Sequence, residues 1–245
     1  MPGEHSFEAF VEASAEAKTV ERLYELLLAA MLYFGFDQLN FSVQRDQALA
    51  SHHQGFGLIS TYPTAWQAFY RDRGFVGIDP VVRWASSAFR PFRWRDIERQ
   101  SELSRQQITF LRKADAAGLH HGIGIPFTGP SLQIAGIALA TSERRISRAV
   151  SLDLLAAYCN QFYKDYKRIV GAEPPVPPPL VTLSHREQEV MVRVAHGRSN
   201  EQIAEALGIG ADTIDYYIRS VFRKLNVHSR VAAATLCLQY GLIEL

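Results

Sequence analysis

Three aromatic side chains that carry a polar group, at positions 62, 66 and 70, could bind a small organic molecule. Tyr62, Trp66 and Tyr70 are spaced four residues apart, so on a helix they would share one face. Their hydroxyl and indole N–H groups would place hydrogen-bonding groups among apolar walls, as a buried small-molecule site requires. Further aromatic residues follow as far as position 94. Such clusters more often form an ordinary hydrophobic core, so the spacing leaves both interpretations open.

Asp79 precedes Pro80, and its carboxylate has two possible roles. It can cap the helix that Pro80 begins, because Asp-Pro suits the N-cap and the first helical position. It can also accept a hydrogen bond from an amide N–H of a bound molecule, where loss of the acceptor would cost about 1–3 kcal/mol. The residues alone favour the cap.

The last quarter of the chain offers chemistry that suits DNA. Apolar residues recur at helical spacing along one side of a segment there: Ile214, Ile218, Val221 and Leu225. The other side presents Asp215, Tyr216, Arg219 and Arg223. The guanidinium of Arg219 could pair with O6 and N7 of a guanine. Four basic residues and no acidic residue lie between positions 216 and 243, which suits contacts to phosphate. A solvated amphipathic bundle would have the same spacing.

Two capping boxes predict the helices before that segment. Ser184 pairs with Glu187, and Ser199 pairs with Gln202. Between the second and third helices lie Gly208 and Gly210, a tight turn in which both glycines tolerate positive φ. The order of helices, caps and turn is that of a DNA-binding helix-turn-helix.

The N-terminal part alternates helical and extended patterns. Strands clustered between pairs of helices predict an α/β/α sandwich with a central, largely antiparallel sheet. With the all-α C-terminal part, the fold class is α+β. We expect helices over residues 7–34 (one or two), 63–73, 80–88, 104–117 and 146–169, and strands over 36–44, 56–60, 92–94, 122–127 and 132–141.

A proline-rich run divides the chain into two predicted domains. Five prolines fall within residues 174–179, where neither helix nor central strand can form. We therefore expect an N-terminal domain over residues 1–171, a linker over 172–180 and a C-terminal domain over 181–245.

Composition indicates a soluble protein without a membrane span or signal peptide. The 245 residues are 47% hydrophobic and 21% charged, and the net charge is +1. No apolar run approaches the roughly 18 residues that a bilayer span needs, and residues 1–5 lack the pattern of a leader. Cys159 and Cys237 fall within apolar helical patterns. We expect them to be reduced, which favours a cytoplasmic location.

The C-terminal segment resembles the DNA-binding domain of the LuxR family. This resemblance implies a four-helix domain that binds a palindromic site as a dimer and regulates transcription. The matching residues are Arg186, Glu187, Glu189, Val190, Gly197, Ser199, Asn200, Ile203, Ala204, Leu207, Ile209, Thr213, Lys224, Leu225, Ser229, Arg230, Ala233, Gly241, Leu242 and Ile243.

The N-terminal part resembles the autoinducer-binding domain of LuxR-type quorum-sensing receptors. The match runs through Tyr62-Pro63-x-x-Trp66, Tyr70, Asp79-Pro80-Val81-Val82 and Trp94, and continues in Gly118-Leu-x-x-Gly122-Ile-x-Ile-Pro126. The resemblance implies an N-acyl-homoserine lactone as the ligand and no other cofactor. Trp66 would donate to the lactone carbonyl, Tyr62 to the acyl carbonyl, and Asp79 would accept the amide N–H. Trp94 would pack on the lactone ring, and Tyr70 and Trp84 would shape the pocket. As the lining of the acyl side we expect Phe41, Val43, Phe56 and Leu58.

Leu139 departs from the family pattern, because many relatives carry a hydroxyl at the position that we align with it. A bulkier, apolar wall beside the acyl group would favour a short branched or aryl acyl chain over a long 3-oxo chain.

On the DNA side, the third helix of the motif should enter the major groove. Arg219 is the candidate for a guanine contact, and Tyr216 shares its face. Asp215 replaces a residue that is commonly basic in the family, and could accept from a cytosine amine or turn away. We expect phosphate contacts from Thr213, Arg223 and Lys224, and further DNA contacts from Ser199 and Asn200. The helix at 146–169 is the candidate dimer element, and RNA polymerase is a further possible partner.

Three alternatives remain. A two-component response regulator shares this DNA-binding domain, but the early strand from Gln38 to Val43 lacks the acidic pair of a receiver domain. A LuxR-type protein could also sense a signal other than a lactone. An enzyme is disfavoured, because the pairs His52-His53 and His120-His121 lack metal-ligand spacing and no nucleophile motif accompanies them.

Overall fold

The computed structural model describes residues 6–129, 133–144, 150–173 and 181–245. By its contacts the chain divides into two compact units, Met1–Pro174 and Pro175–Leu245. Separate hydrophobic cores lie in the two units, so each is described by itself. Among the described helices, none is both long and apolar enough to cross a membrane.

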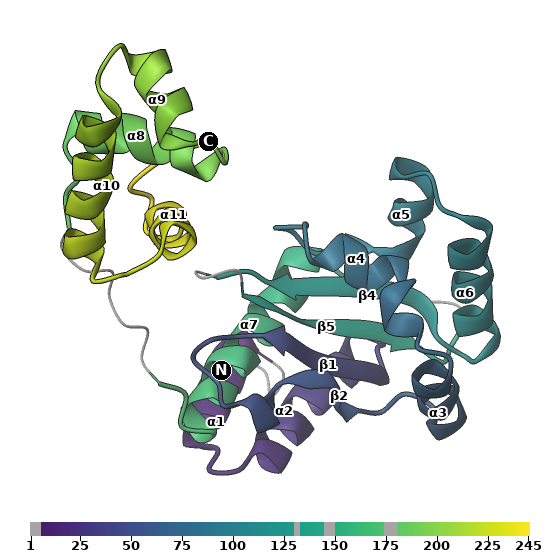
Figure 1. Cartoon of the computed structure of the whole chain (residues 1–245). Coiled ribbons are helices and arrows are strands. Elements are labelled where there is room, and N and C mark those ends of the chain that lie inside the picture. The colour runs from purple at the N-terminus through teal and green to yellow at the C-terminus, as the bar shows by residue number, and fades with distance from the viewer. Residues whose placement is uncertain (1–5, 130–132, 145–149, 174–180) are drawn as a thin grey trace. The chain divides into compact units, whose positions relative to one another are not determined.

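One antiparallel sheet of five strands forms the centre of the N-terminal unit (Figure 1). Its strand order is β2-β1-β5-β4-β3. The strands β1 and β5, which are far apart in the sequence, therefore pair with each other inside the sheet. The strands are β1 (Gln38–Arg45), β2 (Gly55–Ser60), β3 (Phe92–Arg93), β4 (His120–Phe127) and β5 (Ile134–Thr141).

Three helices cover one face of this sheet and enclose its main core (Figure 1). Ser6 and Thr19 begin the first two helices, because each hydroxyl accepts a hydrogen bond from a backbone N–H of the first turn. Leu27 and Phe162 from these helices are fully buried, as is Phe41 from the sheet. The helices are α1 (Phe7–Glu16), α2 (Val20–Tyr33) and α7 (Leu152–Ile169).

Four helices lie over the opposite face, where two smaller apolar clusters form. They are α3 (Thr64–Asp72), α4 (Pro80–Ala85), α5 (Trp94–Gln100) and α6 (Arg105–Ala116), and 3₁₀ turns at Ser51–His53 and Phe75–Gly77 join the longer elements. Ser104 starts α6 with a capping box. The predicted α/β/α sandwich is therefore confirmed.

Two predicted elements differ from the structure. Trp94 does not end a strand but begins α5, a helix that the sequence did not predict. The predicted helix over 146–169 begins only at Leu152, because Val150 and Ser151 are not helical. Residues 146–149 of that prediction lie outside the described residues.

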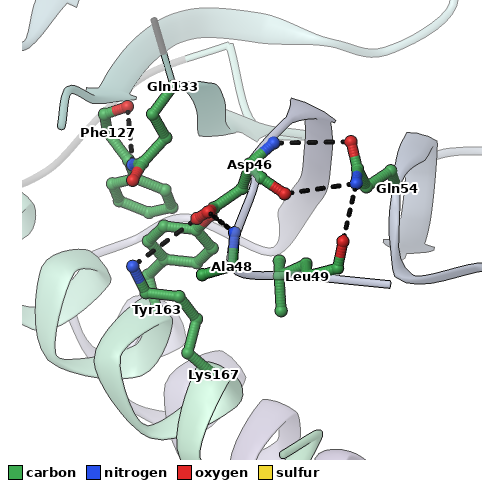
Figure 2. A network of polar contacts seen from close by, with 8 residues as sticks. All are labelled: Asp46, Ala48, Leu49, Gln54, Phe127, Gln133, Tyr163 and Lys167. Carbon is green, nitrogen blue, oxygen red and sulfur yellow. Dashed lines mark hydrogen bonds and ion pairs between the residues drawn. The ribbon is translucent and has the colours of Figure 1, made fainter. Parts of the chain in front are cut away.

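A buried polar network joins the β1–β2 loop to α7 (Figure 2). The carboxylate of Asp46 is only 4% exposed. It accepts hydrogen bonds from the Tyr163 hydroxyl at 2.5 Å and from the Ala48 N–H at 2.9 Å, and Lys167 Nζ lies 3.5 Å away. The side-chain amide of Gln54 closes the loop by donating to the carbonyls of Asp46 and Leu49. This network fixes the loop on the helix that ends the unit.

The C-terminal unit consists of four helices around one apolar core, as predicted. Both predicted capping boxes are present, at Ser184 and Ser199. In the turn after the second helix, Gly208 has a φ of +65°, whereas Gly210 has a φ of −70° and is the N-cap of the next helix. Only Gly208 therefore needs glycine's freedom. The helices are α8 (His185–Ala195), α9 (Asn200–Leu207), α10 (Ala211–Leu225) and α11 (Arg230–Gln239).

Candidate functional site

A cavity of about 310 Å³ lies within the N-terminal unit, on the side of the sheet that carries α3 to α6. Its size suits a small organic molecule, since ligand pockets generally start at about 300 Å³. Most of its wall is apolar, with a few polar side chains among aromatic rings. Five residues that the sequence singled out line it together: Tyr62, Trp66, Tyr70, Asp79 and Trp94.

Asp79 performs the capping role and also faces this cavity. One carboxylate oxygen accepts the N–H of Val81 at 2.8 Å, which caps α4, and the other accepts the Tyr70 hydroxyl at 3.0 Å. Both roles that the sequence left open are therefore compatible, because the two oxygens can accept further hydrogen bonds. Burial raises the pKa of Asp79 to about 6, although the hydrogen bonds from Val81 and Tyr70 oppose the rise.

Tyr62 and Trp66 are held by different elements, and only Trp66 is helical because α3 begins at Thr64, so the predicted shared helical face does not include Tyr62. The Tyr62 hydroxyl donates to the carbonyl of Ala138 on β5 at 3.4 Å. Burial, and then the nearby Asp79 charge, raise the pKa of Tyr62 well above its ordinary value, so the hydroxyl keeps its proton. Trp66 packs against Phe110 of α6 with 5.6 Å between ring centroids. Both side chains are buried and face the cavity from fixed positions.

Trp94 lies at the other side of the cavity. Its ring lies against Gly122 of β4, where any larger side chain would overlap it. Within the described residues, the buried indole N–H of Trp94 has no hydrogen-bond partner. A buried donor without a partner is uncommon, and a bound acceptor would satisfy it.

Three residues that we expected beside the acyl group lie on the other face of the sheet. Phe41, Val43 and Leu139 are fully buried in the core under α1, α2 and α7. Successive side chains of a strand point to opposite faces, so an error of one residue in register moves a side chain from one side to the other. The prediction that Leu139 lies beside the acyl group is wrong for this reason. Its neighbour on the strand, Ala138, faces the cavity instead.

The other three residues that we expected in the cavity wall lie in three different places. Phe56 lines the cavity. Leu58 packs against the core under α1, α2 and α7. Trp84 packs against Phe92 in a neighbouring apolar cluster, with 6.3 Å between ring centroids.

Several cavity residues were not predicted, although the sequence contained a signal for some of them. Between positions 39 and 44, apolar and polar residues alternate, and the apolar members fill the main core. The polar members must therefore face the opposite side. The unpredicted lining residues include Asn40, Ser42, Gln44, Phe110, Gly136 and Ala138.

The two histidines at positions 120 and 121 have local partners. His120 is buried, and its Nδ1 lies 2.6 Å from a carboxylate oxygen of Asp115. His121 is exposed, with Nε2 2.8 Å from the Arg144 carbonyl oxygen. Across the described part of the chain, no group of three or more histidine, cysteine or acidic residues could hold a metal ion.

In the C-terminal unit, α10 presents the predicted polar face. The side chain of Arg219 is 75% exposed, Tyr216 is 62% exposed, and Thr213 and Arg223 are also exposed. The Asp215 carboxylate lies 2.7 Å from Arg219 Nε, one helical turn away. Asp215 thus neutralises part of the Arg219 charge.

Lys224 and Asn200 have intramolecular partners. Lys224 Nζ lies 2.7 Å from the buried Glu187 carboxylate and donates to the Thr182 carbonyl at 3.0 Å. Burial alone would raise the pKa of Glu187, but hydrogen bonds from Lys224, Ser184 and Ser220 outweigh it and hold the pKa at about 2. Asn200 accepts from Arg230, and the Ser199 hydroxyl caps α9. Lys224 therefore has a structural role that the sequence prediction of a phosphate contact did not anticipate.

An aromatic cavity in one unit and a helix-turn-helix in the other define a transcription regulator that responds to a small molecule. Residues 19–162 match the autoinducer binding domain, and residues 181–237 match the bacterial regulatory proteins of the luxR family. The chain therefore belongs to the LuxR family of autoinducer-binding transcriptional regulators, as its sequence predicted.

Relatives of known name agree with this assignment. The chain is 23% identical to the transcriptional activator protein AnoR of Acinetobacter nosocomialis, over 96% of this chain and 98% of that protein. It is 25% identical to the transcriptional activator protein BjaR1 of Bradyrhizobium diazoefficiens, over 96% and 95% of the two chains. These relatives are regulators, in agreement with the expectation that the protein is not an enzyme.

Solved structures of Escherichia coli SdiA share the fold. One covers 97% of this chain and 98% of its own, with a TM-score of 0.57 and 18% sequence identity. A second, of SdiA in complex with octanoyl-rac-glycerol, covers 96% of this chain and 94% of its own, with a TM-score of 0.56 and 19% identity.

Proposed function

We propose that the N-terminal unit binds an N-acyl-homoserine lactone in its cavity. The observation that carries this proposal is the convergence of Tyr62, Trp66, Asp79 and Trp94 on one cavity in a chain of this family. Trp66 would donate to the lactone carbonyl and Tyr62 to the acyl carbonyl. Asp79 would accept the amide N–H, and Trp94 would pack on the lactone ring, with Tyr70 completing the wall.

Leu139 does not favour a short branched or aryl acyl group, because it packs in the core on the opposite face of the sheet. The acyl group must be inferred instead from the residues that face the cavity.

A second candidate ligand is an acylated molecule without a lactone ring. SdiA, which has the same fold, binds octanoyl-rac-glycerol. In such a ligand, a hydroxyl would donate to Asp79 in place of an amide N–H. Trp66 and Tyr62 would donate to oxygen atoms of this ligand, as they would to the carbonyl groups of a lactone.

Mass spectrometry of the bound ligand separates these candidates. The full chain is expressed in cells fed with a panel of acyl-homoserine lactones and a monoacylglycerol, purified and extracted with organic solvent. We expect one lactone at close to one molecule per chain. Tyr62→Phe and Trp66→Phe, which each remove one donor and keep an aromatic ring, should lower the recovered amount. Tyr216→Phe, a hydroxyl deletion outside the cavity, should not. Recovery of the monoacylglycerol alone would refute the lactone assignment.

For the C-terminal unit, we propose that α10 enters the major groove of a palindromic promoter site and that two chains bind as a homodimer, with α7 as the candidate dimer element. RNA polymerase is a further partner that such a regulator could contact. Residues 172–180 would connect this DNA-binding domain to the ligand domain. The basic and exposed face of α10 supports the proposal.

Arg219 provides the test of this DNA contact. Its substitution by alanine should weaken binding to the preferred site by about 1–3 kcal/mol and relax preference at one base pair. Binding is measured on a library of sites with one changed position each. Asp215→Asn is the matched variant, and it should tighten binding because the Arg219 charge is freed. Equal weakening on all sequences would make Arg219 a phosphate contact instead.

A further inference from the structure

The floor of the cavity is polar along one strand. Asn40, Ser42 and Gln44 of β1 face the cavity, because the apolar residues between them fill the core on the opposite side. The neighbouring strand, β5, contributes only small residues beside the first two. In the sheet register, Ala138 lies opposite Asn40, and Gly136 lies opposite Ser42. The small neighbours leave the two polar side chains accessible from the cavity.

Asn40 and Ser42 are only partly satisfied by the protein. Ser42 Oγ accepts from the Gly57 N–H at 2.9 Å and from Asn40 Nδ2 at 3.3 Å. In the described part of the chain, the Ser42 hydroxyl donates no hydrogen bond and Asn40 Oδ1 accepts none. The floor thus offers one donor and one acceptor side by side, and leaving such groups unpaired when a ligand displaces water is costly.

This pair lies close to the proposed position of the acyl carbonyl. The Tyr62 hydroxyl contacts the Ala138 carbonyl, and Ala138 is paired with Asn40 across the sheet. Opposed residues lie about 5 Å apart, and residues two positions apart on a strand lie about 7 Å apart. An acyl chain that runs from the Tyr62 hydroxyl along the cavity floor therefore reaches Asn40 and then Ser42.

We propose that the cavity selects an acyl group that carries a hydroxyl. This inference rests on the proposed lactone-binding function and specifies the ligand class. A hydroxyl both donates and accepts, so it can pair with Asn40 Oδ1 and with the Ser42 hydroxyl at once. A methylene would leave both unpaired, and a keto group could pair only with Ser42. Sites that are built to bind a substrate hydroxyl reject the analogue that lacks it.

Two matched ligand pairs test the proposal on the full chain, with affinities measured by competition binding. The first pair is the 3-hydroxyoctanoyl and octanoyl homoserine lactones, with the 3-oxo analogue beside them. The second is the 4-hydroxyphenylacetyl and phenylacetyl lactones, which place the hydroxyl farther along the floor. In at least one pair, the hydroxylated ligand should bind about fivefold to tenfold more tightly.

Variants assign this preference to the floor. Ser42→Ala and Asn40→Ala should each reduce this preference to less than about twofold, because alanine neither pairs with a ligand hydroxyl nor leaves a polar group unpaired beside a methylene. Ser86→Ala is the control: it makes the same change at an exposed serine, the C-cap of α4, and should behave as the wild type. If Ser42→Ala fails to fold, because Ser42 also supports Gly57, Asn40→Ala still provides the test.

The outcomes separate this inference from the proposed function. If the lactones bind but neither pair shows a preference, or if the preference survives in Asn40→Ala, hydroxyl selection is wrong and lactone binding stands. If none of the five lactones binds to the wild type, the proposed function itself fails.

Discussion

Asp79 is the residue whose ionisation should control ligand binding. Its carboxylate faces the cavity, caps α4 and accepts from Tyr70. Burial raises its pKa to about 6, compared with 3.8 for an exposed aspartate. The folded, ligand-free unit is therefore stabilised as pH falls from about 6 toward 4, because the folded state takes up a proton before the unfolded state does. A ligand that donates to the carboxylate prefers the ionised form, so its affinity changes in the opposite direction.

We predict that ligand affinity is constant above about pH 7 and falls by up to about tenfold per pH unit below 6. Asp79→Asn should weaken binding by about 1.5–3 kcal/mol and remove most of this pH dependence. Asparagine is also a good N-cap, so the variant should remain folded. Calorimetric titration from pH 5 to pH 8 measures both effects. An unchanged pH profile in Asp79→Asn would show that a different group titrates.

Residue types and local spacing were enough to predict most of the cavity wall on α3 and α4. Trp66 and Tyr70 share a face of α3, and Asp79 followed by proline marks the start of α4, whereas Tyr62 precedes α3 and is not helical. The floor was harder to predict, because it depends on which side of a strand faces the helices. Leu139 was assigned without a known register, and in a strand such an error moves the side chain to the opposite face.

Elements with their own caps and periodicity were predicted from sequence, and elements fixed by tertiary contacts were not. Both capping boxes in the C-terminal unit and the Ser104 box of α6 form as their residues indicate. By contrast, α5 has no side-chain cap and only seven residues. Its Ile97 is buried in a cluster with Val81 of α4 and Phe92 of β3, which belong to other elements. Packing against these residues supports the helix, and local sequence does not reveal such packing.

The network around Asp46 should matter for the stability of the N-terminal unit. Tyr163→Phe removes the 2.5 Å hydrogen bond and leaves a buried carboxylate with Lys167 and the Ala48 N–H as remaining partners. We predict a loss of about 1.5–3 kcal/mol in the free energy of unfolding. The matched control is Tyr166→Phe on the same helix, whose hydroxyl has only a 3.5 Å contact to His53. It should cost less than about 1 kcal/mol. Urea denaturation of both variants compares them, and equal losses would contradict a special role for Asp46.

Lys224 should contribute to the stability of the C-terminal unit through Glu187. Lys224→Met should lower the free energy of unfolding by about 1.5–3 kcal/mol at pH 7, because the buried carboxylate loses a charged donor. The pKa of Glu187 is held at about 2, below its ordinary 4.5. Its stabilisation is therefore complete above pH 4.5 and is lost as pH falls toward 2. The difference between the variant and the wild type should shrink over that interval in denaturation experiments. A constant difference down to pH 2 would exclude the ion pair as its cause.

At the scale of the whole molecule, two cores in one chain predict two unfolding transitions, and ligand should move only one of them. The cavity is formed entirely by residues of the N-terminal unit. A ligand that binds only the folded form stabilises that unit by RT ln(1 + [L]/Kd), about 2.7 kcal/mol at a concentration of 100 Kd. For a unit of this size, the melting temperature should rise by about 5–10 °C. Scanning calorimetry with and without the lactone measures both transitions, and Trp66→Phe is the control with a reduced shift. Operator DNA should move the other transition. If the lactone alone moved both transitions, the two units would not be independent, and ligand binding would be coupled directly to the stability of the DNA-binding helices.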